Sequence, residues 1–250
     1  MATGRVPASG QIVRTAGPMG PAGGDKLRYV NEIGSDGWLQ ARSEATHALI
    51  PLAKYTAVRI SGDQGGRTTF TVVDGPQAGQ RLSVTTSNAD RYLGTRAPVR
   101  SPARIEVTYG RYVRGWHSVA RSQDLDQQMA TLRIEGTSVQ VTMNTNWGGS
   151  FYPLPPGEYE VLVPDAPHNA NMTRYYRNTY KDLIYDQVWF PIRYKDNSRF
   201  VHIGNVSDGC VTVLDMDRWA AIHEALISHR SADGSSVARL VVKGKPEREK

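Results

Sequence analysis

Cysteine is almost absent from this 250-residue chain, which contains only Cys210. A single thiol cannot form a disulfide within the chain, and it cannot supply the paired cysteines of a structural zinc site. The six histidines are dispersed, and the sequence contains no H-E-x-x-H motif. We therefore expect no metal site and no cofactor.

Long apolar runs are also missing. No hydrophobic stretch approaches the roughly 20 residues that a membrane-spanning helix needs, and the N-terminus lacks the apolar core of a signal peptide. The sequence therefore predicts no transmembrane segment. If the substrate lies outside the cytoplasm, the signal segment has been removed or export uses another route.

The net charge of +6 is not accompanied by a nucleic-acid-binding motif. A basic balance equally suits an anionic polymer such as a bacterial cell wall. We therefore expect no nucleic-acid partner. The sequence carries no signal for an oligomeric state.

Residue types that favour strands and turns are abundant. The chain has 12 Tyr, 24 Gly and 14 Pro, together with many Thr and Val. Its hydrophobic content of 39% and charged content of 22% are ordinary for a soluble globular protein. This composition predicts a mainly β fold.

Composition divides the chain into four segments. Residues 1–25 are rich in Gly and Pro and predict a flexible arm, whereas residues 244–250 predict a frayed, solvated basic tail. A proline-flanked polar stretch near residue 100 separates a small β-rich module at 26–100 from a second domain at 101–243. We expect the module to be barrel-like, and its clearest strands are 57–60, 68–73 and 81–85.

Strand patterns also dominate the second domain. A hairpin turn is expected at Gly136 and Thr137. The long polar segment 164–186 is of the kind that covers or forms a binding site. The expected strands are residues 104–109, 130–135, 138–143, 158–163, 188–192 and 237–242.

One helix is predicted near the end of this domain. Trp219, Ile222 and Leu226 recur at helical spacing, so the helix is expected to pack one apolar face on the sheet. His223 and His229 fall outside that set and are expected to face solvent.

The stretch around Cys210 is the best candidate for an active site. Apolar residues on either side of His202 predict a buried strand, and S-D-G at 207–209 predicts a turn leading to Cys210 and a second strand at 211–213. Two adjacent strands can bring an imidazole to a thiol, and a neighbouring histidine keeps a nucleophilic cysteine ionised. The competing interpretation is a small buried apolar cysteine without a catalytic role.

The sequence around His202 and Cys210 resembles a known family signature. S-D-G-C after H-x-G-N is similar to the motif of the L,D-transpeptidase catalytic-domain family, in which a His-Gly element precedes S-x-G-C. The stretch P-P-G-E-Y-E-V at 155–161 resembles a strand of that family upstream of its site, and residues 214–227 resemble its short helix. The resemblance spans about residues 104–242. It implies a β-sandwich with one or two short helices.

The resemblance also implies a chemistry and an environment. Cys210 would attack a carbonyl of a peptidoglycan stem peptide, His202 would act as base, and the amides of Gly209 and Cys210 would hold the oxyanion. Ser207 would shape the turn. Such an enzyme would work in the periplasm or cell wall. The expected substrate-binding residues are Asn205, Asp208, Thr212, His168 and Tyr176.

The chain departs from the family pattern in three ways. Asp208 replaces a His, Thr212 stands where the family usually has an Arg, and the connection between His and Cys is shorter. Three hypotheses follow: a cysteine acyltransferase or peptidase acting on peptidoglycan, a wall-targeting toxin or phage lytic factor of the same chemistry, and a non-catalytic wall-binding β module.

Overall fold

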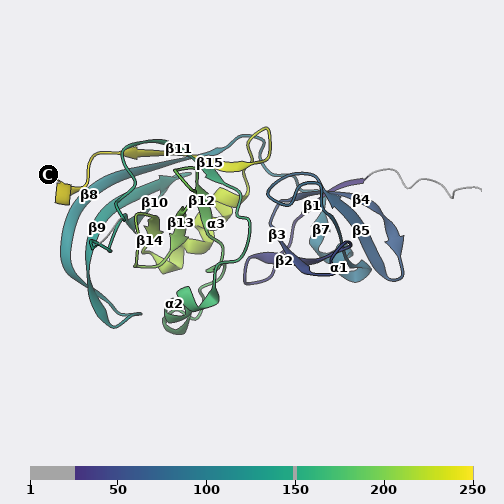
Figure 1. Cartoon of the computed structure of the whole chain (residues 1–250), viewed down its shortest axis with the longest axis horizontal. Helices are drawn as coiled ribbons and strands as arrows, with labels where there is room; N and C mark the ends of the chain where they lie inside the picture. Colours follow the sequence, from purple (N-terminus) through teal and green to yellow (C-terminus); the bar gives the residue numbers. More distant parts are fainter. Residues whose placement is uncertain (1–25, 149–150, 250) are drawn as a thin grey trace, which may run out of the picture.

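A computed structural model describes residues 26–148 and 151–249. The fold is mainly β, with 44% strand and 14% helix, and its two sheets and few short helices are consistent with a β-sandwich. The fold class predicted from composition is therefore confirmed. In Figure 1 the N-terminal sheet lies on the right and the C-terminal strands form the larger unit on the left. The expected arm at 1–25 lies outside the described residues.

The N-terminal unit is a seven-stranded sheet with the order β3-β2-β6-β5-β4-β1-β7. Every pairing in it is antiparallel, and the side chains of β5 alternate between buried and half-buried positions as a one-sided strand requires. Its strands are β1 (Lys26–Val30), β2 (Trp38–Ser43), β3 (Leu49–Ala53), β4 (Ala57–Gln64), β5 (Arg67–Val72), β6 (Arg81–Thr85) and β7 (Leu93–Gly94).

A short helix that the sequence patterns did not indicate, α1 (Thr86–Tyr92), connects β6 to β7. The Thr85 hydroxyl caps it by accepting a hydrogen bond from the amide of Asn88 at 3.3 Å. Ala89 is its one buried residue, so the helix shows almost no apolar stripe to predict it by.

The C-terminal strands close into a barrel with the order β10-β14-β13-β12-β11-β15-β8-β9. The pairs β13–β14 and β15–β8 are parallel, and the other pairings are antiparallel. The strands are β8 (Ala103–Ser118), β9 (Gln123–Ile134), β10 (Thr137–Thr142), β11 (Gly157–Leu162), β12 (Phe190–Ile192), β13 (Arg199–Ile203), β14 (Val211–Val213) and β15 (Ser236–Lys243).

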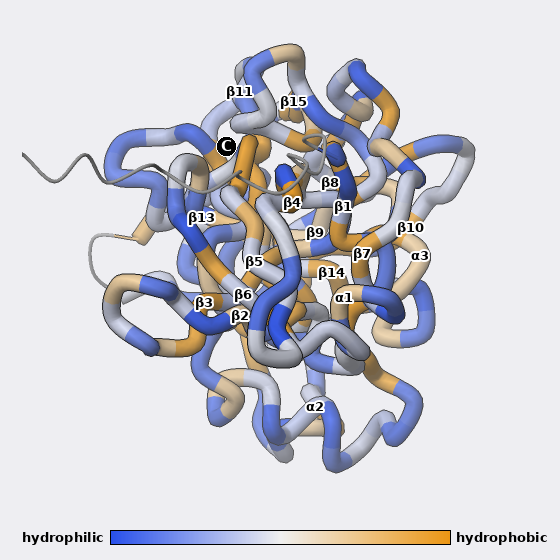
Figure 2. Tube along the Cα trace, turned by 90° about the vertical axis from the view of Figure 1, so that its right-hand side faces the viewer, coloured by the Kyte–Doolittle hydropathy of each residue, from blue (hydrophilic) through white to orange (hydrophobic). Residues whose placement is uncertain are grey.

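The segment at 164–186 contains two short helices, η1 (Ala170–Met172) and α2 (Arg174–Thr179). Figure 2 shows that the tube around α2 is mostly hydrophilic. Three of its residues nevertheless anchor it: Tyr176 and Leu183 are buried, and the hydroxyl of buried Thr173 donates to the carboxylate of Asp186. The segment is thus held against the barrel.

The predicted C-terminal helix is α3 (Trp219–Ile227), which follows the single turn η2 (Met216–Arg218). Trp219, Ile222 and Leu226 are buried as expected. The expectation that His223 faces solvent is wrong: its side chain is only 1% exposed and stacks on Tyr185 at 4.4 Å between ring centroids. The reason is helical geometry, because position 223 lies four residues after Trp219 and three before Leu226, on the same face.

His229, just after α3, is not free in solvent either. One of its ring nitrogens lies 2.8 Å from the Ser101 carbonyl and the other 2.7 Å from the Glu135 carboxylate. These contacts join the end of α3 to the start of β8 and to the β9–β10 turn.

The end of the chain is also more ordered than expected. Residues 247–249 form the turn η3 (Glu247–Glu249), and the Glu247 carboxylate accepts a hydrogen bond from the Tyr112 amide at 2.7 Å. The guanidinium of Arg248 lies 4.4 Å from the ring centroid of Trp147. The prediction of a frayed basic tail is therefore wrong for these residues, which dock on β8 and on the residues after β10. Lys250 lies outside the described part.

A packed junction joins the sheet to the barrel. Trp38, Ala53 and Tyr55 of the sheet belong to the same apolar cluster as the barrel core. The Lys54 ammonium and the Tyr55 hydroxyl each lie 2.9 Å from the carboxylate of Glu224 on α3. Buried Arg230 reaches from the barrel to the sheet and donates to the Lys54 carbonyl at 2.8 Å.

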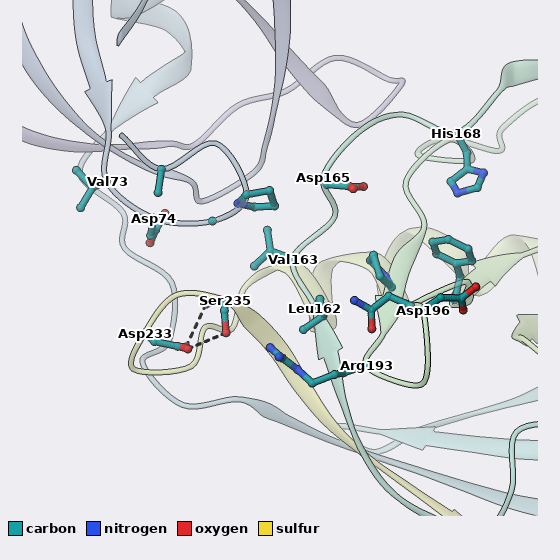
Figure 3. Close-up of a pocket in the computed structure, with 16 residues that line it drawn as sticks. Val73, Asp74, Leu162, Val163, Asp165, His168, Arg193, Asp196, Asp233 and Ser235 are labelled. Carbon is teal, nitrogen blue, oxygen red and sulfur yellow. Dashed lines mark hydrogen bonds between the residues drawn. The ribbon is translucent and has the colours of Figure 1, made fainter. Parts of the chain in front are cut away.

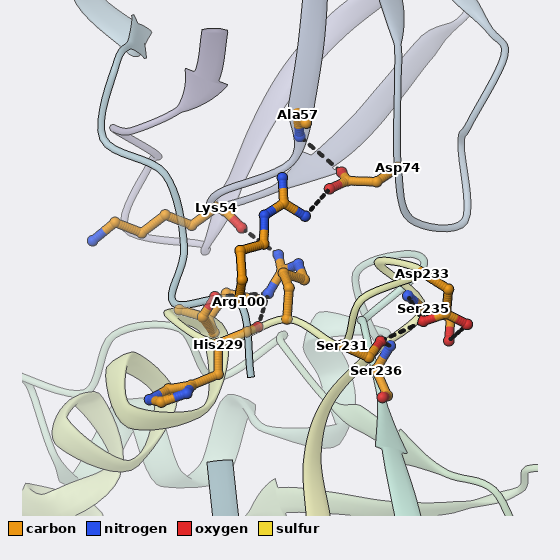
Figure 4. Close-up of polar contacts among 11 residues, drawn as sticks. Lys54, Ala57, Asp74, Arg100, His229, Ser231, Asp233, Ser235 and Ser236 are labelled. Atoms are coloured by element: carbon orange, nitrogen blue, oxygen red, sulfur yellow. Dashed lines mark hydrogen bonds and ion pairs between the residues drawn. The ribbon is translucent and has the colours of Figure 1, made fainter. Parts of the chain in front are cut away.

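Beside this arginine, the Asp74 carboxylate accepts a hydrogen bond from the Ala57 amide at 2.8 Å and lies 3.9 Å from the Arg100 guanidinium (Figure 4). Burial lowers the pKa of Arg230 to about 10, so it remains charged at neutral pH.

No helix in the described part of the chain has both the length and the apolar character needed to cross a bilayer.

Candidate active site

The strands that carry His202 and Cys210 are neighbours and run in parallel. β13 and β14 pair with Val201 opposite Val211 and His202 opposite Thr212. Parallel strands are usually joined by a dozen or more residues, yet only residues 204–210 join these two. The short return suffices because the pairing is three residues wide, so the chain has to step back only about 7 Å.

Ser207 holds this return in place. Its hydroxyl donates to the Cys210 carbonyl at 3.0 Å, and its amide donates to the Thr145 hydroxyl at 2.9 Å. Its carbonyl accepts from the Thr145 amide at 2.8 Å. Ser207 is therefore placed as a turn-shaping residue, with its hydroxyl bound to backbone.

Asn205 ties the return to two other elements. Its side chain accepts from the Tyr176 hydroxyl at 2.9 Å and donates to the Ser118 hydroxyl at 2.6 Å, and its carbonyl accepts from the Gln127 amide group at 3.0 Å. Only 3% of Asn205 is exposed. It is thus a buried connector, and the ring of Tyr176 is the part of this network that reaches the cavity described below.

Gly209 sets the backbone immediately before the thiol. Its φ of +87° lies in the region that favours glycine, and a Cβ there would lie 2.1 Å from the Tyr152 carbonyl oxygen and 2.7 Å from the Nε of Arg199. No residue with a side chain fits this position without a shift of the neighbouring backbone.

Cys210 and His202 line one cavity of about 270 Å³. Of the residues predicted to form the site, the structure brings five to its wall: Cys210, His202, His168, Tyr176 and Asp208. Asn205, Ser207, Gly209 and Thr212 support this wall without lining it.

The hydrogen bonds of His202 assign its tautomer. Its Nδ1 lies 2.9 Å from the Ile203 carbonyl, and because a carbonyl can only accept, Nδ1 carries the proton. Nε2 of the neutral ring is then an acceptor, and it binds the Thr212 hydroxyl at 2.9 Å. Nε2 is therefore the basic atom of the site, and Thr212 occupies its lone pair in this state.

Trp189 lies between two imidazoles. Its ring stacks on His202 at 3.9 Å between centroids and on His168 at 3.8 Å. Burial lowers the pKa of His202 to about 3 and also lowers the pKa of His168. Both rings are consequently neutral at physiological pH.

The thiol of Cys210 is neutral too. Burial raises its pKa to about 11, although the Phe200 amide and the Arg199 guanidinium act in the opposite direction. Within the described residues, no hydrogen bond joins Cys210 to His202. The expectation that His202 keeps the thiol ionised is therefore wrong for this state, because desolvation outweighs the charges nearby.

The cavity wall also contains residues that were not among the predicted site residues, and the polar or aromatic ones most relevant to its chemistry are Arg121, Trp189 and Arg199. Strand alternation places Arg199 on the face opposite Phe200 and His202, so periodicity carries no signal for it. Arg121 lies after the end of β8, in a turn that no strand pattern marked. The V-W-F-P-I run marked the Trp189 region as strand, but not its position in the site.

A larger cavity of about 650 Å³ lies between the sheet and the barrel and shares His168 and Phe200 with the thiol cavity (Figure 3). Asp233 in its wall is held by the Ser235 hydroxyl at 2.8 Å, and Asp196 by the Ser198 hydroxyl at 2.7 Å. These carboxylates are thus bound by their own loops.

Comparisons of the chain with family models, curated proteins and solved structures give no match. The described residues contain no group of three or more His, Cys, Asp or Glu side chains placed to hold a metal ion. The chemistry of the site must therefore be argued from its own residues.

Proposed function

We propose that the protein is a cysteine-dependent acyltransferase or peptidase that acts on peptidoglycan stem peptides, of the L,D-transpeptidase or L,D-carboxypeptidase type. The observation that carries this proposal is that the only thiol and a neutral imidazole line one cavity, from parallel strands joined by a glycine-dependent turn. The resemblance of H-x-G-N and S-D-G-C to the family signature supplies the substrate class.

The neutral resting state determines the order of events in the proposed reaction. Because burial disfavours both thiolate and imidazolium, the thiol proton passes to Nε2 of His202 while Sγ of Cys210 attacks the carbonyl carbon. The Thr212 hydroxyl has to release Nε2 for this transfer. The amides of Gly209 and Cys210 are the proposed donors to the oxyanion.

The remaining steps follow from the same two groups. The C–N bond breaks, and Nε2 returns its proton to the leaving amine, which gives a thioester on Cys210. An acceptor amine or water then attacks the thioester carbonyl while His202 takes the proton of that nucleophile, and the C–S bond breaks as Nε2 returns the proton to Sγ of Cys210. An amine completes a cross-link, and water gives the carboxypeptidase or peptidase outcome.

The proposed place of action is the periplasm or cell wall, where this substrate occurs. A delivered toxin or a phage lytic factor would use the same chemistry in another context. A wall-binding module without catalysis is the alternative from a different class, and the buried, neutral state of Cys210 is the observation in its favour.

The test is mass spectrometry of defined muropeptides after incubation with the protein. We expect new cross-linked or trimmed products and a transient acyl adduct on the protein, and Cys210→Ala should reduce product formation by at least about 10³-fold. The melting temperature should change little, because the side chains of Cys and Ala differ by one heavy atom, the sulfur. Wild-type turnover in a folded Cys210→Ala protein would refute the assignment of the nucleophile.

A further inference from the structure

Arg199 brings a positive charge that has no ion-pair partner among the described residues to the thiol cavity. It lines the same wall as Cys210, and its Nε is buried without a hydrogen-bond partner. Among the described residues, the only hydrogen bond of its side chain is a 3.3 Å contact from Nη1 to the neighbouring Ser198 hydroxyl, and its guanidinium lies 5.6 Å from the ring centroid of Phe151. In the described part of the chain Arg199 forms no ion pair. A buried guanidinium nitrogen without an acceptor is costly, and an anionic ligand would remove that cost.

The turn before Cys210 is built around this arginine. Continuing the β13–β14 register by two residues from the Val201–Val211 pair places Phe200 beside Cys210 and Arg199 beside Gly209. Neighbouring strands lie about 4.8 Å apart, and a Cβ on Gly209 would come within 2.7 Å of Nε. An anion on Arg199 would therefore lie within one residue of the carbonyl that Cys210 attacks.

A second arginine faces the same cavity. Arg121 lies 4.9 Å above the ring of Tyr175 and, among the described residues, makes no ion pair. Asp208 is the one carboxylate in the cavity wall, and the histidines there are neutral. Two guanidinium groups thus face one carboxylate, so the cavity favours an anion.

We propose that Arg199, supported by Arg121, binds a free carboxylate of the substrate next to the scissile bond and thereby restricts the enzyme to the ends of peptide stems. This inference rests on the proposed function for the identity of the substrate. The ligand class is a peptide with a free C-terminal carboxylate.

The experiment separates binding from chemistry. Calorimetry on Cys210→Ala protein compares a synthetic stem tetrapeptide that has a free C-terminal carboxylate with the same peptide as its carboxamide. We expect the acid to bind at least about 10-fold more tightly than the amide, since a charge-assisted bidentate contact is lost in the amide. Arg199→Gln should remove this difference, and Arg199→Lys should keep part of it. Arg239→Gln, on an exposed arginine paired with Glu158, is the control and should change nothing.

Equal binding of acid and amide, or no binding of the acid, would overturn the anion site. An equal loss for both peptides in Arg199→Gln would show that the arginine serves packing only. Turnover by the wild-type protein is read separately. Acid-selective binding without an acyl adduct would refute the proposed function and leave the anion site standing. Turnover of acid and amide at the same rate would refute the anion site and leave the proposed function standing.

Discussion

The sheet and the barrel of this protein differ in the direction of their strand pairings and in the ionisable groups that they bury. In the sheet every pairing is antiparallel, and its one histidine within the described residues, His47, is exposed. The barrel contains both parallel pairs and buries His202, His223 and Cys210. Buried ionisable groups thus concentrate in the unit with the less regular topology. The comparison teaches that the sheet is a scaffold with low electrostatic cost, whereas the barrel carries the desolvated groups that chemistry requires.

The largest effect is expected at the junction that makes the two units one molecule. Arg230→Ala removes the donor to the Lys54 carbonyl of the sheet and to the Ile227 and His229 carbonyls of the barrel. Leaving these groups unpaired beside a new void should lower the free energy of unfolding by about 4 kcal/mol. Urea denaturation should then show two transitions in place of one. Arg239→Ala, at an exposed position, is the control, and a similar loss there would contradict the role of the junction.

Glycines in the two units should respond unequally to the same substitution. Gly65 in the β4–β5 turn has a φ of +58° with nothing within 4 Å of an added Cβ, so Gly65→Ala should cost about 1 kcal/mol. Gly209→Ala adds a clash with the Tyr152 carbonyl to the same backbone strain and should cost about 3 kcal/mol. Thermal melts of both variants measure this difference. Equal costs would mean that the connection of residues 204–210, which leads to Cys210, adjusts to the added methyl group without strain.

As the pH falls, the barrel should lose stability before the sheet does. Burial lowers the pKa of His202 and of His223 to about 3, whereas the unfolded chain binds these protons below about pH 6.5. Stability from both groups is therefore present above pH 6.5 and is lost as the pH falls from there towards 3. Each histidine should lower the free energy of unfolding by about 2 kcal/mol between pH 7 and 5.

Urea titrations across this pH range measure the slope. His223→Phe keeps the ring stacked on Tyr185 and should reduce the slope by about one proton. A slope that is unchanged in this variant would show that His223 is protonated in the folded state. His47→Phe, at an exposed position of the sheet, is the matched control for the substitution itself.

The smallest expected effect is on the pH dependence of alkylation at the Cys210 thiol. Because burial raises the pKa of Cys210 to about 11, alkylation by iodoacetamide should have a midpoint above the ordinary value of about 8.5. An exposed thiol in the sheet, Asn88→Cys in a Cys210→Ala background, gives the reference rate. A Cys210 midpoint below the reference would show that an ionised cysteine, and not the neutral pair, is the resting state.

Local patterns predicted the strands better than their partners. The strands at 81–85 and 211–213 are found at the expected residues, and the hairpin at Gly136 is confirmed. The prediction at 104–109 covers only the first part of β8, because the rest of that strand is polar and half exposed. The parallel pairing of β13 with β14 and of β15 with β8 depends on contacts far apart in the chain, which no window of residues contains.

The candidate site shows the same limit. The His202 and Cys210 pattern marked one part of the wall of the thiol cavity, because these two residues are close in sequence. Arg121, Trp189 and the hydrogen bond from Thr212 to His202 come from the tertiary arrangement. Burial decided the protonation states, and the sequence could not indicate it, since the same motif on an exposed strand would have ordinary pKa values.

The position of β15 in the barrel determines when the barrel can close during synthesis of the chain. β15 is the last of the described strands in the chain, yet it pairs on one side with β11 and on the other with β8. The sheet has all its strands once β7 has emerged, so it can form early in synthesis. The barrel stays open between β11 and β8 until residue 243 has been added. Between the addition of residue 94 and that of residue 243, the nascent chain therefore carries a completed sheet and an unclosed barrel.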